Sequence, residues 1–424
     1  MKNYNIIKKL NERLLINQIT EEKRITKLLL KKKISLYCGF DPTSDSLHIG
    51  HLIPLLSLKR FQLYGHKPII LIGGATSLIG DPSFKINERE LNKKKNINIW
   101  SKKIKEQIKK FLDFNCFLNN AIIINNYNWF KNINILDFLR NIGKFFSVNK
   151  MIKKEFFKQR LKYENKNISY TEFSYNILQS FDFLKLYKKY KVYLQIGGSD
   201  QWGNIITGID LIKRIYKKNV YGITLPLITQ SNGIKFGKTE KNTIWLSKKK
   251  TSPYKFYQFW INTNDNDVYK FLKFFTFISL KKINELEKKE KNINKRPKAQ
   301  YILAREITRI VHGKKGLCAA ERITKSLFTG IFNNMTKFDF LQLKQDSMPI
   351  IYLKKETSLK KSIIIAGFVS SYNIAYNIIK SNAISINNKK QINPNYIFKN
   401  SDFLYGIYTI IKMGKKKFCL IIWK

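Results

Sequence analysis

The feature that most limits the fold is a repeated order of strand-like segment, turn and helix-like segment. Each strand-like segment runs into a turn signal: residues 34–40 before Asp41-Pro42-Thr43, 68–72 before Gly73-Gly74, and 192–196 before Gly197-Gly198. Helical runs follow at residues 52–64 and from about residue 204. This alternation predicts an α/β fold with a parallel sheet and crossover helices. Ligands bind such sheets at the carboxyl ends of the strands, where these turns lie.

The remainder of the chain predicts further parts. At about 150 residues per domain, 424 residues correspond to about three domains. A mostly helical insert occupies about residues 85–190, and 250–345 show helical periodicity with many charges. Two short helices within 359–379 and strand-like pieces at 384–386 and 418–423 follow. We therefore expect a parallel-sheet domain at 1–247, an α-helical domain at 248–345 and a small α+β domain at 346–424.

Composition excludes several classes of protein. Hydrophobic residues make up 44% and aromatics 14%, so wholesale disorder is excluded. No apolar stretch approaches the roughly 18 residues that cross a bilayer. The N-terminal segment has apolar residues at Ile6, Ile7 and Leu10, a spacing that predicts an amphipathic helix rather than a signal peptide. The four cysteines lie far apart without a Cys-x-x-Cys pair. We therefore expect a cytoplasmic protein without a membrane partner or disulfide framework.

The charge is extreme. Lys and Arg number 79 against 29 Asp and Glu, a net charge of +50 that attracts polyanions such as RNA or an anionic membrane surface. The chain is also crowded with Lys, Asn, Ile, Phe and Tyr, as an AT-rich genome would produce, and that bias adds lysine without selecting it for any partner. Charge therefore favours an RNA partner without establishing one.

Two of the four histidines stand together in His48-Ile49-Gly50-His51, at the expected start of the first sheet-associated helix. Helix N-termini favour anions such as phosphate, and imidazole donors there can bind phosphoryl oxygens. Gly50 would permit close approach of a purine or ribose. No further ligands stand at metal-binding spacing, so we expect no protein-held metal. The alternative is two incidental histidines at a helix start.

A second cluster, Lys235-Phe236-Gly237-Lys238-Thr239, follows Pro226 and the turn signal at 231–233. Two lysines separated by a short pair of residues could close on a triphosphate as point charges. In so lysine-rich a chain the alternative is a plain surface loop. The position of this lysine cluster in the chain gives it value as a signal, because it follows the histidine motif by about 185 residues and comes after the strand–glycine turns.

The two clusters together resemble the HIGH and KMSKS signatures of class I aminoacyl-tRNA synthetases. Further blocks resemble the bacterial-type tyrosyl-tRNA synthetase family: Tyr-Cys-Gly-Phe-Asp-Pro-Thr at 37–43, Gly-Gly-Ala-Thr-Ser-Leu-Ile-Gly-Asp-Pro at 73–82, Tyr-Thr-Glu-Phe-Ser-Tyr at 170–175, Gln-Ser-Phe-Asp at 179–182 and Gln-Ile-Gly-Gly-Ser-Asp-Gln-Trp-Gly-Asn at 195–204. The resemblance covers nearly the whole chain. It implies a Rossmann-like catalytic domain with a helical dimerisation insert, an α-helical domain on the anticodon side and an RNA-binding domain of a ribosomal-protein type.

The resemblance also implies a site for L-tyrosine. The substrate phenol would lie between Tyr37 and Asp182, and phenylalanine would leave that buried carboxylate unpaired. The implied ligands of the ammonium group are Asp81, Tyr175 and Gln179, and Gln201 would orient the carboxylate of the amino acid.

The implied ATP site uses residues of both signatures. Gly39, Gly50, Gly198 and Asp200 would hold adenosine, Cys38 would lie close to the ribose, and the remaining implied ATP ligands are Asp41, His48, His51 and Lys238. The implied catalytic residues surround the phosphates: Thr43, His48, His51, Lys85, Arg89, Lys235, Lys238 and Thr239. In the implied reaction the tyrosine carboxylate attacks the α-phosphorus of ATP, pyrophosphate leaves, and a tRNA ribose hydroxyl then takes the tyrosyl group.

The implied partners are tRNA(Tyr), ATP accompanied by Mg²⁺ that phosphates and water bind, and a second copy of the chain; no tightly bound cofactor is expected. Segment 136–144 resembles the family's dimer interface, with an intrachain core as the alternative. The last domain departs from its relatives, because Tyr372, Asn373 and Tyr376 stand where arginines are usual. Lysines at 389–390 and 415–417 would compensate through phosphate contacts.

Other functions stay open on the sequence. A tryptophan-specific enzyme of the same fold would differ at Tyr37 and Asp182. A nucleotidyltransferase also uses a His-x-Gly-His helix start but does not explain the second lysine cluster. A non-catalytic RNA-binding protein on a synthetase scaffold would not require the intact histidine, lysine and carboxylate positions.

Overall fold

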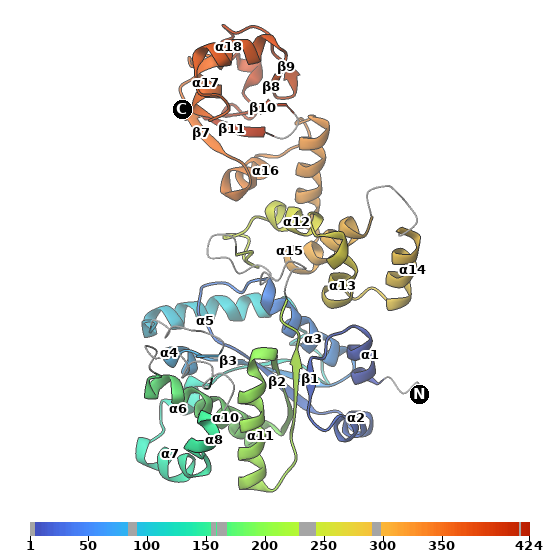
Figure 1. Ribbon diagram of the computed structural model, residues 1–424, viewed down its shortest axis with the longest axis vertical. Helices are drawn as coiled ribbons and strands as arrows, with labels where there is room; N and C mark the ends of the chain where they lie inside the picture. Colours follow the sequence, from blue (N-terminus) through green and yellow to red (C-terminus); the bar gives the residue numbers. More distant parts are fainter. Residues whose placement is uncertain are drawn as a thin grey trace. The chain divides into compact units, whose positions relative to one another are not determined.

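The computed structural model describes residues 5–83, 91–153, 158, 168–228, 243–290, 298–414 and 417–424 (Figure 1). The chain forms two compact units: unit 1 is Met1–Leu246 with Asn264–Ala299, and unit 2 is Ser247–Thr263 with Gln300–Lys424. The division into three domains at residues 247 and 345 stays a prediction.

Unit 1 is built on a six-stranded sheet of order β1-β6-β5-β2-β3-β4. Its strands are β1 (Gln18–Ile19), β2 (Ser35–Phe40), β3 (Lys67–Ile72), β4 (Ile122–Asn125), β5 (Val192–Gly198) and β6 (Tyr221–Leu225). Strands β2 to β6 run parallel, and only β1 pairs antiparallel, with β6. The predicted α/β class with a parallel sheet is confirmed.

The strand order reverses beside β2. The chain leaves β2 for β3 and β4 on one side, and returns to β5 and β6 on the other. Tyr37 on β2 stands in register with Gln195 on β5. The carboxyl ends of β2 and β5 therefore mark the switch point at which such sheets bind ligands.

The two faces of this sheet are covered by different helices. Helices α10 (Tyr170–Tyr190) and α11 (Trp202–Tyr216) form a buried core with Tyr37, Ile69 and Leu71. Side chains alternate along a strand, so Phe40 lies on the other face, where its ring is 6.2 Å from that of His51. α3 (Leu52–Leu63) follows His51 and packs on β2, β3 and β5.

Other helices of unit 1 connect or flank the strands. They are α1 (Ile6–Glu12), α2 (Glu22–Lys31), η1 (Ile49–His51), α4 (Thr76–Ile79), α5 (Lys94–Ile108), α6 (Tyr127–Phe130), α7 (Ile135–Asn141), η2 (Gly143–Phe145), α8 (Val148–Ile152), η3 (Ser199–Gln201), α13 (Asp265–Phe275) and α14 (Leu280–Glu290). α15 (Lys298–Thr329) runs on into unit 2 and is broken at Gly313, whose φ is 71°.

The insert between β3 and β5 is less purely helical than the sequence predicts. Strand β4 lies within it and pairs in parallel with β3, from Ile69 opposite Ile122 to Ile72 opposite Asn125. The run Ile-Ile-Ile is too short to distinguish a strand from a helical segment by periodicity. The insert therefore contributes an edge strand of the six-stranded sheet.

Unit 2 carries a five-stranded sheet of order β7-β11-β10-β8-β9. Its strands are β7 (Ile350–Leu353), β8 (Ile384–Ile386), β9 (Lys389–Lys390), β10 (Tyr408–Met413) and β11 (Lys417–Trp423). Helix α12 (Pro253–Ile261) precedes α15 in the chain. The helices after α15 are α16 (Lys337–Gln342), η4 (Leu343–Ser347), α17 (Leu359–Ile365), α18 (Tyr372–Lys380) and η5 (Asn400–Asp402). The predicted helices and strands of this region are present, and β7, β9 and β10 are added to them.

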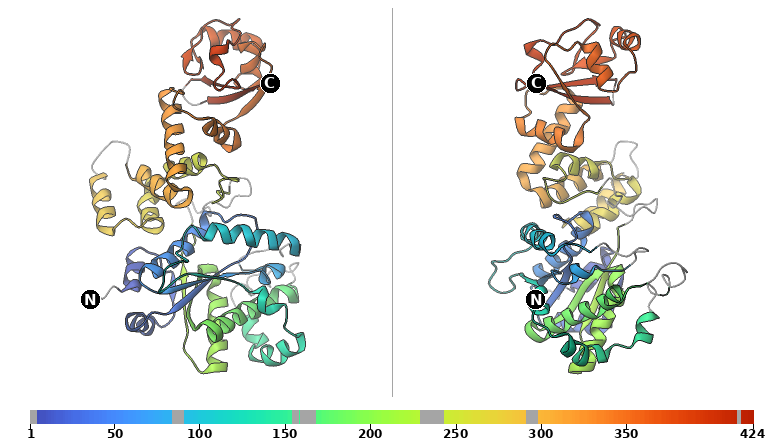
Figure 2. Two further views of the ribbon diagram at one scale, coloured as in Figure 1. Left: turned by 180° about the vertical axis from the view of Figure 1, so that it is seen from behind. Right: turned by 90° about the vertical axis from the view of Figure 1, so that its left-hand side faces the viewer.

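This second sheet is buried on both faces. Ile411, Ile421 and Trp423 pack with residues of α17 and α18, whereas Ile410 and Leu420 pack with residues that include Phe340 of α16. Figures 1 and 2 show the sheet between the α17–α18 pair and α16. Among the described residues no helix is long and apolar enough to cross a membrane.

Candidate active site at the carboxyl ends of β2 and β5

A buried carboxyl group stands at the centre of the site. Asp182 on α10 is 2% exposed and accepts hydrogen bonds from Asn126 Nδ2 at 3.0 Å and Trp129 Nε1 at 2.9 Å. Burial raises the pKa of Asp182 to about 8, although the two hydrogen bonds oppose that shift. The carboxyl group is thus held in one orientation by two donors from the segment that follows β4.

Tyr37 supplies a second buried polar group beside it. Its hydroxyl is buried and has no hydrogen-bond partner among the described residues, and its ring centroid lies 5.2 Å from that of Phe183. Burial and the nearby Asp182 raise the pKa of this phenol well above its ordinary value. A ligand hydroxyl placed here could accept from Tyr37 and donate to Asp182. The pair therefore suits a phenol.

A second network joins α10 to the end of β2. The Tyr175 hydroxyl donates to Asp41 Oδ2 at 2.8 Å, and Thr76 Oγ1 donates to Asp41 Oδ1 at 2.8 Å. Asn126 Nδ2 donates to Thr76 Oγ1 at 3.1 Å, which links this network to Asp182. Burial, followed by the charges of Asp41 and Asp81, raises the pKa of Tyr175 well above its ordinary value. Asp81 therefore lies within electrostatic reach of the same hydroxyl.

Amide side chains connect the remaining predicted tyrosine ligands. Gln179 Nε2 donates to Gln201 Oε1 at 3.0 Å, and Gln201 Nε2 donates to Asp81 Oδ2 at 2.6 Å. Asn204 Nδ2 donates to Gln179 Oε1 at 3.0 Å. A carboxylate and amides in one chain of contacts can bind both an ammonium group and a carboxylate. The six predicted tyrosine-site residues thus fall into two neighbouring clusters, one with Tyr37 and Asp182 and one with Asp81, Tyr175, Gln179 and Gln201.

The histidine motif has a defined arrangement. Gly50 N donates to His48 Nδ1 at 3.0 Å, and His48 N donates to His51 Nδ1 at 3.2 Å. The ring centroids lie 4.0 Å apart. Because each Nδ1 accepts a backbone N–H, the proton of a neutral ring is on Nε2. Each imidazole can therefore present an N–H donor.

The chain that follows the second signature is paired with this motif. Ile49 N donates to the Ile244 carbonyl at 3.1 Å, and Leu246 N donates to the Leu47 carbonyl at 2.8 Å. Trp245 and His48 form a β-bridge. The predicted residues Lys85, Arg89, Lys235, Lys238 and Thr239 lie outside the described residues. The described segment after residue 242 nevertheless begins beside His48.

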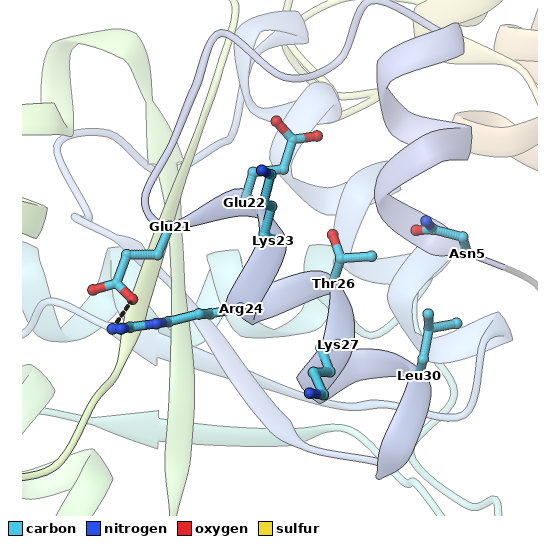
Figure 3. A pocket seen from close by; sticks show the side chains of 8 residues that line it. All are labelled: Asn5, Glu21, Glu22, Lys23, Arg24, Thr26, Lys27 and Leu30. Atoms are coloured by element: carbon cyan, nitrogen blue, oxygen red, sulfur yellow. Dashed lines mark hydrogen bonds and ion pairs between the residues drawn. The ribbon is translucent and has the colours of Figure 1, made fainter.

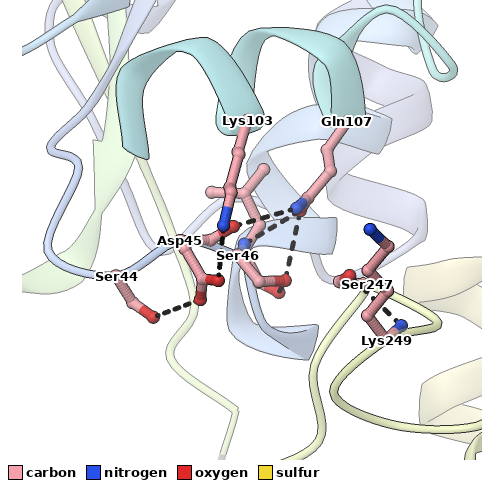
Figure 4. A network of polar contacts seen from close by, with 8 residues as sticks. Ser44, Asp45, Ser46, Lys103, Gln107, Ser247 and Lys249 are labelled. Carbon is pink, nitrogen blue, oxygen red and sulfur yellow. Dashed lines mark hydrogen bonds and ion pairs between the residues drawn. The ribbon is translucent and has the colours of Figure 1, made fainter. Parts of the chain in front are cut away.

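The loop before His48 is held by α5. Lys103 Nζ lies 3.0 Å from Asp45 Oδ2, and Leu47 N donates to Gln107 Oε1 at 2.9 Å (Figure 4). Ser46 Oγ donates to the same Gln107 oxygen at 3.3 Å. Thr43, at the start of this loop, is exposed and its N–H donates to the Asp41 carbonyl. The loop thus has a fixed path between β2 and the histidines.

Three of the four predicted adenosine ligands, Gly39, Gly198 and Asp200, lie at the ends of β2 and β5, whereas Gly50 lies in η1. A Cβ on Gly39 would have no atom within 4 Å, so the backbone there is open, whereas a Cβ on Gly198 would come 2.5 Å from Asp200 Oδ1. Burial, with a contribution from Asp200, raises the pKa of the Cys38 thiol to about 12. Cys38 on β2 and Asp200 in η3, directly after β5, therefore lie within electrostatic reach of each other.

Sequence reasoning missed several polar residues of the site. Asn126 and Trp129 hold Asp182, Thr76 holds Asp41, and Asn204 holds Gln179. The available signal was the pair Asn125-Asn126 directly after the apolar run of β4. Polar residues at the end of a parallel strand are candidates for a ligand site.

No group of three or more His, Cys, Asp or Glu side chains in the described part of the chain is arranged to hold a metal. A separate surface cavity of about 1060 Å³ lies along α1 and α2, where Arg24 pairs with Glu21 at 2.7 Å (Figure 3). None of its lining residues belongs to the predicted site: Asn5, Glu21, Glu22, Lys23, Arg24, Thr26, Lys27 and Leu30.

Two family models match the chain. Residues 29–329 match the tRNA synthetases class I (W and Y), and residues 339–421 match the tyrosine–tRNA ligase SYY-like C-terminal domain. Among solved structures, a C-terminally truncated mitochondrial tyrosyl-tRNA synthetase of Aspergillus nidulans aligns with a TM-score of 0.70 and 28% identity, over 77% of this chain and 95% of that one. The corresponding Coccidioides posadasii structure aligns with a TM-score of 0.65 and 31% identity, over 75% and 91%.

Full-length relatives indicate which members of this class I family the chain resembles. The tyrosine–tRNA ligase of Pectobacterium atrosepticum is 59% identical over 424 residues, and that of Yersinia pseudotuberculosis is 56% identical over 423 residues, with 100% of both chains covered in each case. These matches extend through both the catalytic and the C-terminal regions. The chain therefore belongs to the bacterial-type tyrosyl-tRNA synthetases of class I.

Proposed function

We propose that the chain attaches tyrosine to tRNA(Tyr) in two ATP-dependent steps, at the switch point between β2 and β5. Membership of the family and the full-length tyrosine–tRNA ligase relatives support the reaction. The observation that carries the choice of amino acid is the buried Tyr37 hydroxyl, which has no hydrogen-bond partner within the described part of the chain and lies beside the buried Asp182 carboxyl group.

In the proposed complex the substrate phenol lies between Tyr37 and Asp182. Asn126 donates to Oδ2 of Asp182 and Trp129 donates to Oδ1, which leaves further hydrogen-bonding capacity of the carboxyl group for the substrate hydroxyl. Phenylalanine would bury the Asp182 carboxyl group without a hydroxyl partner, at the cost of an unsatisfied polar group. Asp81, Tyr175 and Gln179 bind the ammonium group, and Gln201 orients the carboxylate.

The first step joins that carboxylate to the α-phosphorus of ATP. The carboxylate oxygen attacks in line, the bond to the bridging oxygen breaks, and pyrophosphate leaves with the electron pair. Gly39, Gly50, Gly198 and Asp200 hold adenosine, with Cys38 near the ribose. Asp41 holds Tyr175 and Thr76 beside the reacting carboxylate. Catalysis here is positioning together with electrostatic stabilisation.

Donors from both signatures act on the phosphates. Thr43, His48 and His51 face the phosphates of bound ATP. The Nε2–H groups of the two histidines serve as donors, an assignment supported by the backbone N–H groups that donate to both Nδ1 atoms. From the second signature Lys235, Lys238 and Thr239 stabilise the leaving pyrophosphate, and Lys85 and Arg89 assist them. The pairing of Trp245 with His48 supports a second signature that acts next to the first.

The second step transfers the tyrosyl group to RNA. A ribose hydroxyl of the terminal adenosine attacks the carbonyl carbon of tyrosyl-adenylate, and AMP leaves. We propose that Mg²⁺ accompanies ATP and is held by phosphate oxygens and water, since the described residues offer no three-ligand metal group. When it is bound, Mg²⁺ would neutralise part of the negative charge of the phosphates.

A second copy of the chain is the proposed partner of the insert. Large apolar side chains of α7 and α8 are exposed: Ile135, Leu136, Leu139, Val148 and Ile152. Burial of these five would remove apolar surface from water on association. Sedimentation of Leu136→Asp should give a monomer where the parent chain gives a dimer. Leu63→Asp, at a comparably exposed leucine on α3, is the control and should stay dimeric.

For the remainder we propose a helical anticodon-side domain at 248–345 and an RNA-binding domain at 346–424 whose lysines 389–390 and 415–417 contact phosphates. All four cysteines are free thiols, which supports a reducing cytoplasm as the compartment.

The decisive experiment is ATP–pyrophosphate exchange with tyrosine, phenylalanine or tryptophan as the only amino acid. We expect exchange with tyrosine alone. Exchange with tryptophan would favour the tryptophan-specific enzyme, and no exchange by folded protein that still binds tRNA would favour the non-catalytic RNA-binding protein.

A further inference from the structure

The outward face of α18 carries aromatic and amide side chains with a lysine at its end. Ala375 and Ile379 are fully buried under the helix, whereas Tyr372 is 56% and Tyr376 is 39% exposed. Tyr372, Tyr376 and Lys380 are spaced four residues apart, so they follow one another along one side of the helix. Asn373 and Asn377 are exposed with the same spacing in the adjacent row.

We propose that this face of α18 binds unpaired bases of tRNA by stacking on Tyr372 and Tyr376. The inference rests on the proposed function, because it takes tRNA as the partner, and it concerns how the RNA is held. Every base has a flat face that can stack on an aromatic ring, and an amide can bind base edges. Tyrosine and asparagine therefore suit exposed bases better than they suit the phosphates of a duplex.

The two rings are not required by the fold of unit 2. Tyr405, which is 54% exposed, donates to the Met335 carbonyl at 2.7 Å, and Tyr396 donates to Asp402 at 2.7 Å, so those hydroxyls tie loops together. Within the described part of unit 2, the hydroxyls of Tyr372 and Tyr376 form no hydrogen bond. The helix itself is capped by Ser371, whose Oγ accepts from Ile374 N at 3.3 Å.

Cations stand at the C-terminal end of the same face. Lys380 Nζ lies 4.9 Å from the centroid of the Tyr376 ring. Lys390 Nζ donates to the Asn382 carbonyl at 2.6 Å, directly beyond the end of α18. Aromatic rings beside cations form the combination that binds single-stranded nucleic acid, since the cations hold the backbone while the rings stack the bases.

The charge of the region selects a polyanion over an apolar partner. Residues 346–424 contain 13 lysines against three acidic residues, a net charge of +10. A second copy of this chain would bring the same positive charge to the contact. The occupant that agrees with both the rings and the charge is therefore RNA.

The test measures the affinity of the full chain for a tRNA(Tyr) transcript over a salt series. Tyr372→Ala/Tyr376→Ala should bind at least tenfold more weakly, because each stacked base contributes about 1–3 kcal/mol. The slope of log affinity against log salt should stay unchanged, since no phosphate contact is lost. Tyr372→Phe/Tyr376→Phe keeps the rings and should bind like the parent.

Two controls separate stacking from charge and from general damage. Ile374→Ala removes an exposed apolar side chain that lies about 160–200° around the helix from Tyr372 and Tyr376, and should bind like the parent. Lys380→Gln/Lys390→Gln should weaken binding and reduce the salt slope by about 1–2. The melting temperature of each variant establishes that unit 2 stays folded.

The inference is overturned if the alanine pair binds tRNA within twofold of the parent, or if Ile374→Ala causes an equal loss. It is also overturned if the alanine pair dissociates a dimer without changing RNA affinity, which would identify a second copy as the occupant. ATP–pyrophosphate exchange with tyrosine needs no tRNA and should be unchanged in the alanine pair and in Ile374→Ala. Absence of exchange in the parent chain would instead count against the proposed function.

Discussion

The hydroxyl of Tyr175 on α10 donates a hydrogen bond of 2.8 Å to the carboxylate of Asp41 at the end of β2. The other Asp41 oxygen accepts from Thr76, which itself accepts from Asn126. Four segments far apart in sequence are thereby joined around the proposed amino-acid site.

Tyr175→Phe removes that donor while it keeps the ring. We expect kcat/KM for tyrosine in pyrophosphate exchange to fall roughly 10–100-fold, since a hydrogen bond to a charged group contributes about 1.5–3 kcal/mol. Tyr170→Phe, at a 70% exposed tyrosine of the same helix, is the matched control. An unchanged KM for tyrosine in Tyr175→Phe would contradict the ligand role.

Two glycines of the site should respond differently to alanine. A Cβ at Gly73 would come 1.7 Å from Asp41 Oδ1, so Gly73→Ala should displace Asp41 and lower the melting temperature. A Cβ at Gly39 would meet nothing within 4 Å, so Gly39→Ala should keep the parent melting temperature. If adenosine lies over Gly39, that second variant should still raise the KM for ATP at least about tenfold. A normal KM would remove Gly39 from the ATP site.

The buried Asp182 should make stability depend on pH. Its pKa is raised from 3.8 to about 8, so the folded chain holds a proton that the unfolded chain releases above pH 4. This contribution is fully present below about pH 4 and is lost as the pH rises through about 8. Asp182→Asn cannot ionise, so its free energy of unfolding relative to the parent should rise from pH 5 to 9 by up to a few kcal/mol. Denaturant unfolding at both pH values checks this, and a pH-independent difference would argue against a raised pKa.

Lys238→Ala tests the second signature. Adenylate formation in single-turnover experiments should slow roughly 10²-fold or more, because one donor to the developing phosphate charge is lost. Tyrosine affinity should change little. Lys248→Ala, at an exposed lysine ten positions away, is the control. A near-normal rate in Lys238→Ala would remove the assigned role.

Arg60 should contribute to stability at a distance from the chemistry. It is 6% exposed and donates to the carbonyls of Phe274 at 3.1 Å and Thr276 at 2.8 Å, at the C-terminal end of α13. Arg60→Met should lower the free energy of unfolding by about 1.5–3 kcal/mol, because charged donors to helix-end carbonyls are lost. Arg24→Met, which breaks the exposed pair with Glu21, should change it by less than about 1 kcal/mol. Equal effects would contradict the buried-donor account.

The sequence by itself determined the class of fold and the family. Strand and turn signals around Gly73 and Gly197 were sufficient for a parallel sheet, since they depend on local chain chemistry. Ordered motifs such as 48–51 identified the family because each is a contiguous run of residues. The site assignments stay predictions that the proposed experiments test.

Tertiary structure decided what joins those motifs. β4 became the sheet edge only through pairing with β3, and the roles of Asn126 and Trp129 follow from their approach to Asp182 across more than 50 residues. The raised pKa of Asp182 likewise arises from burial by other segments. These features depend on long-range packing and desolvation, which local sequence patterns do not record.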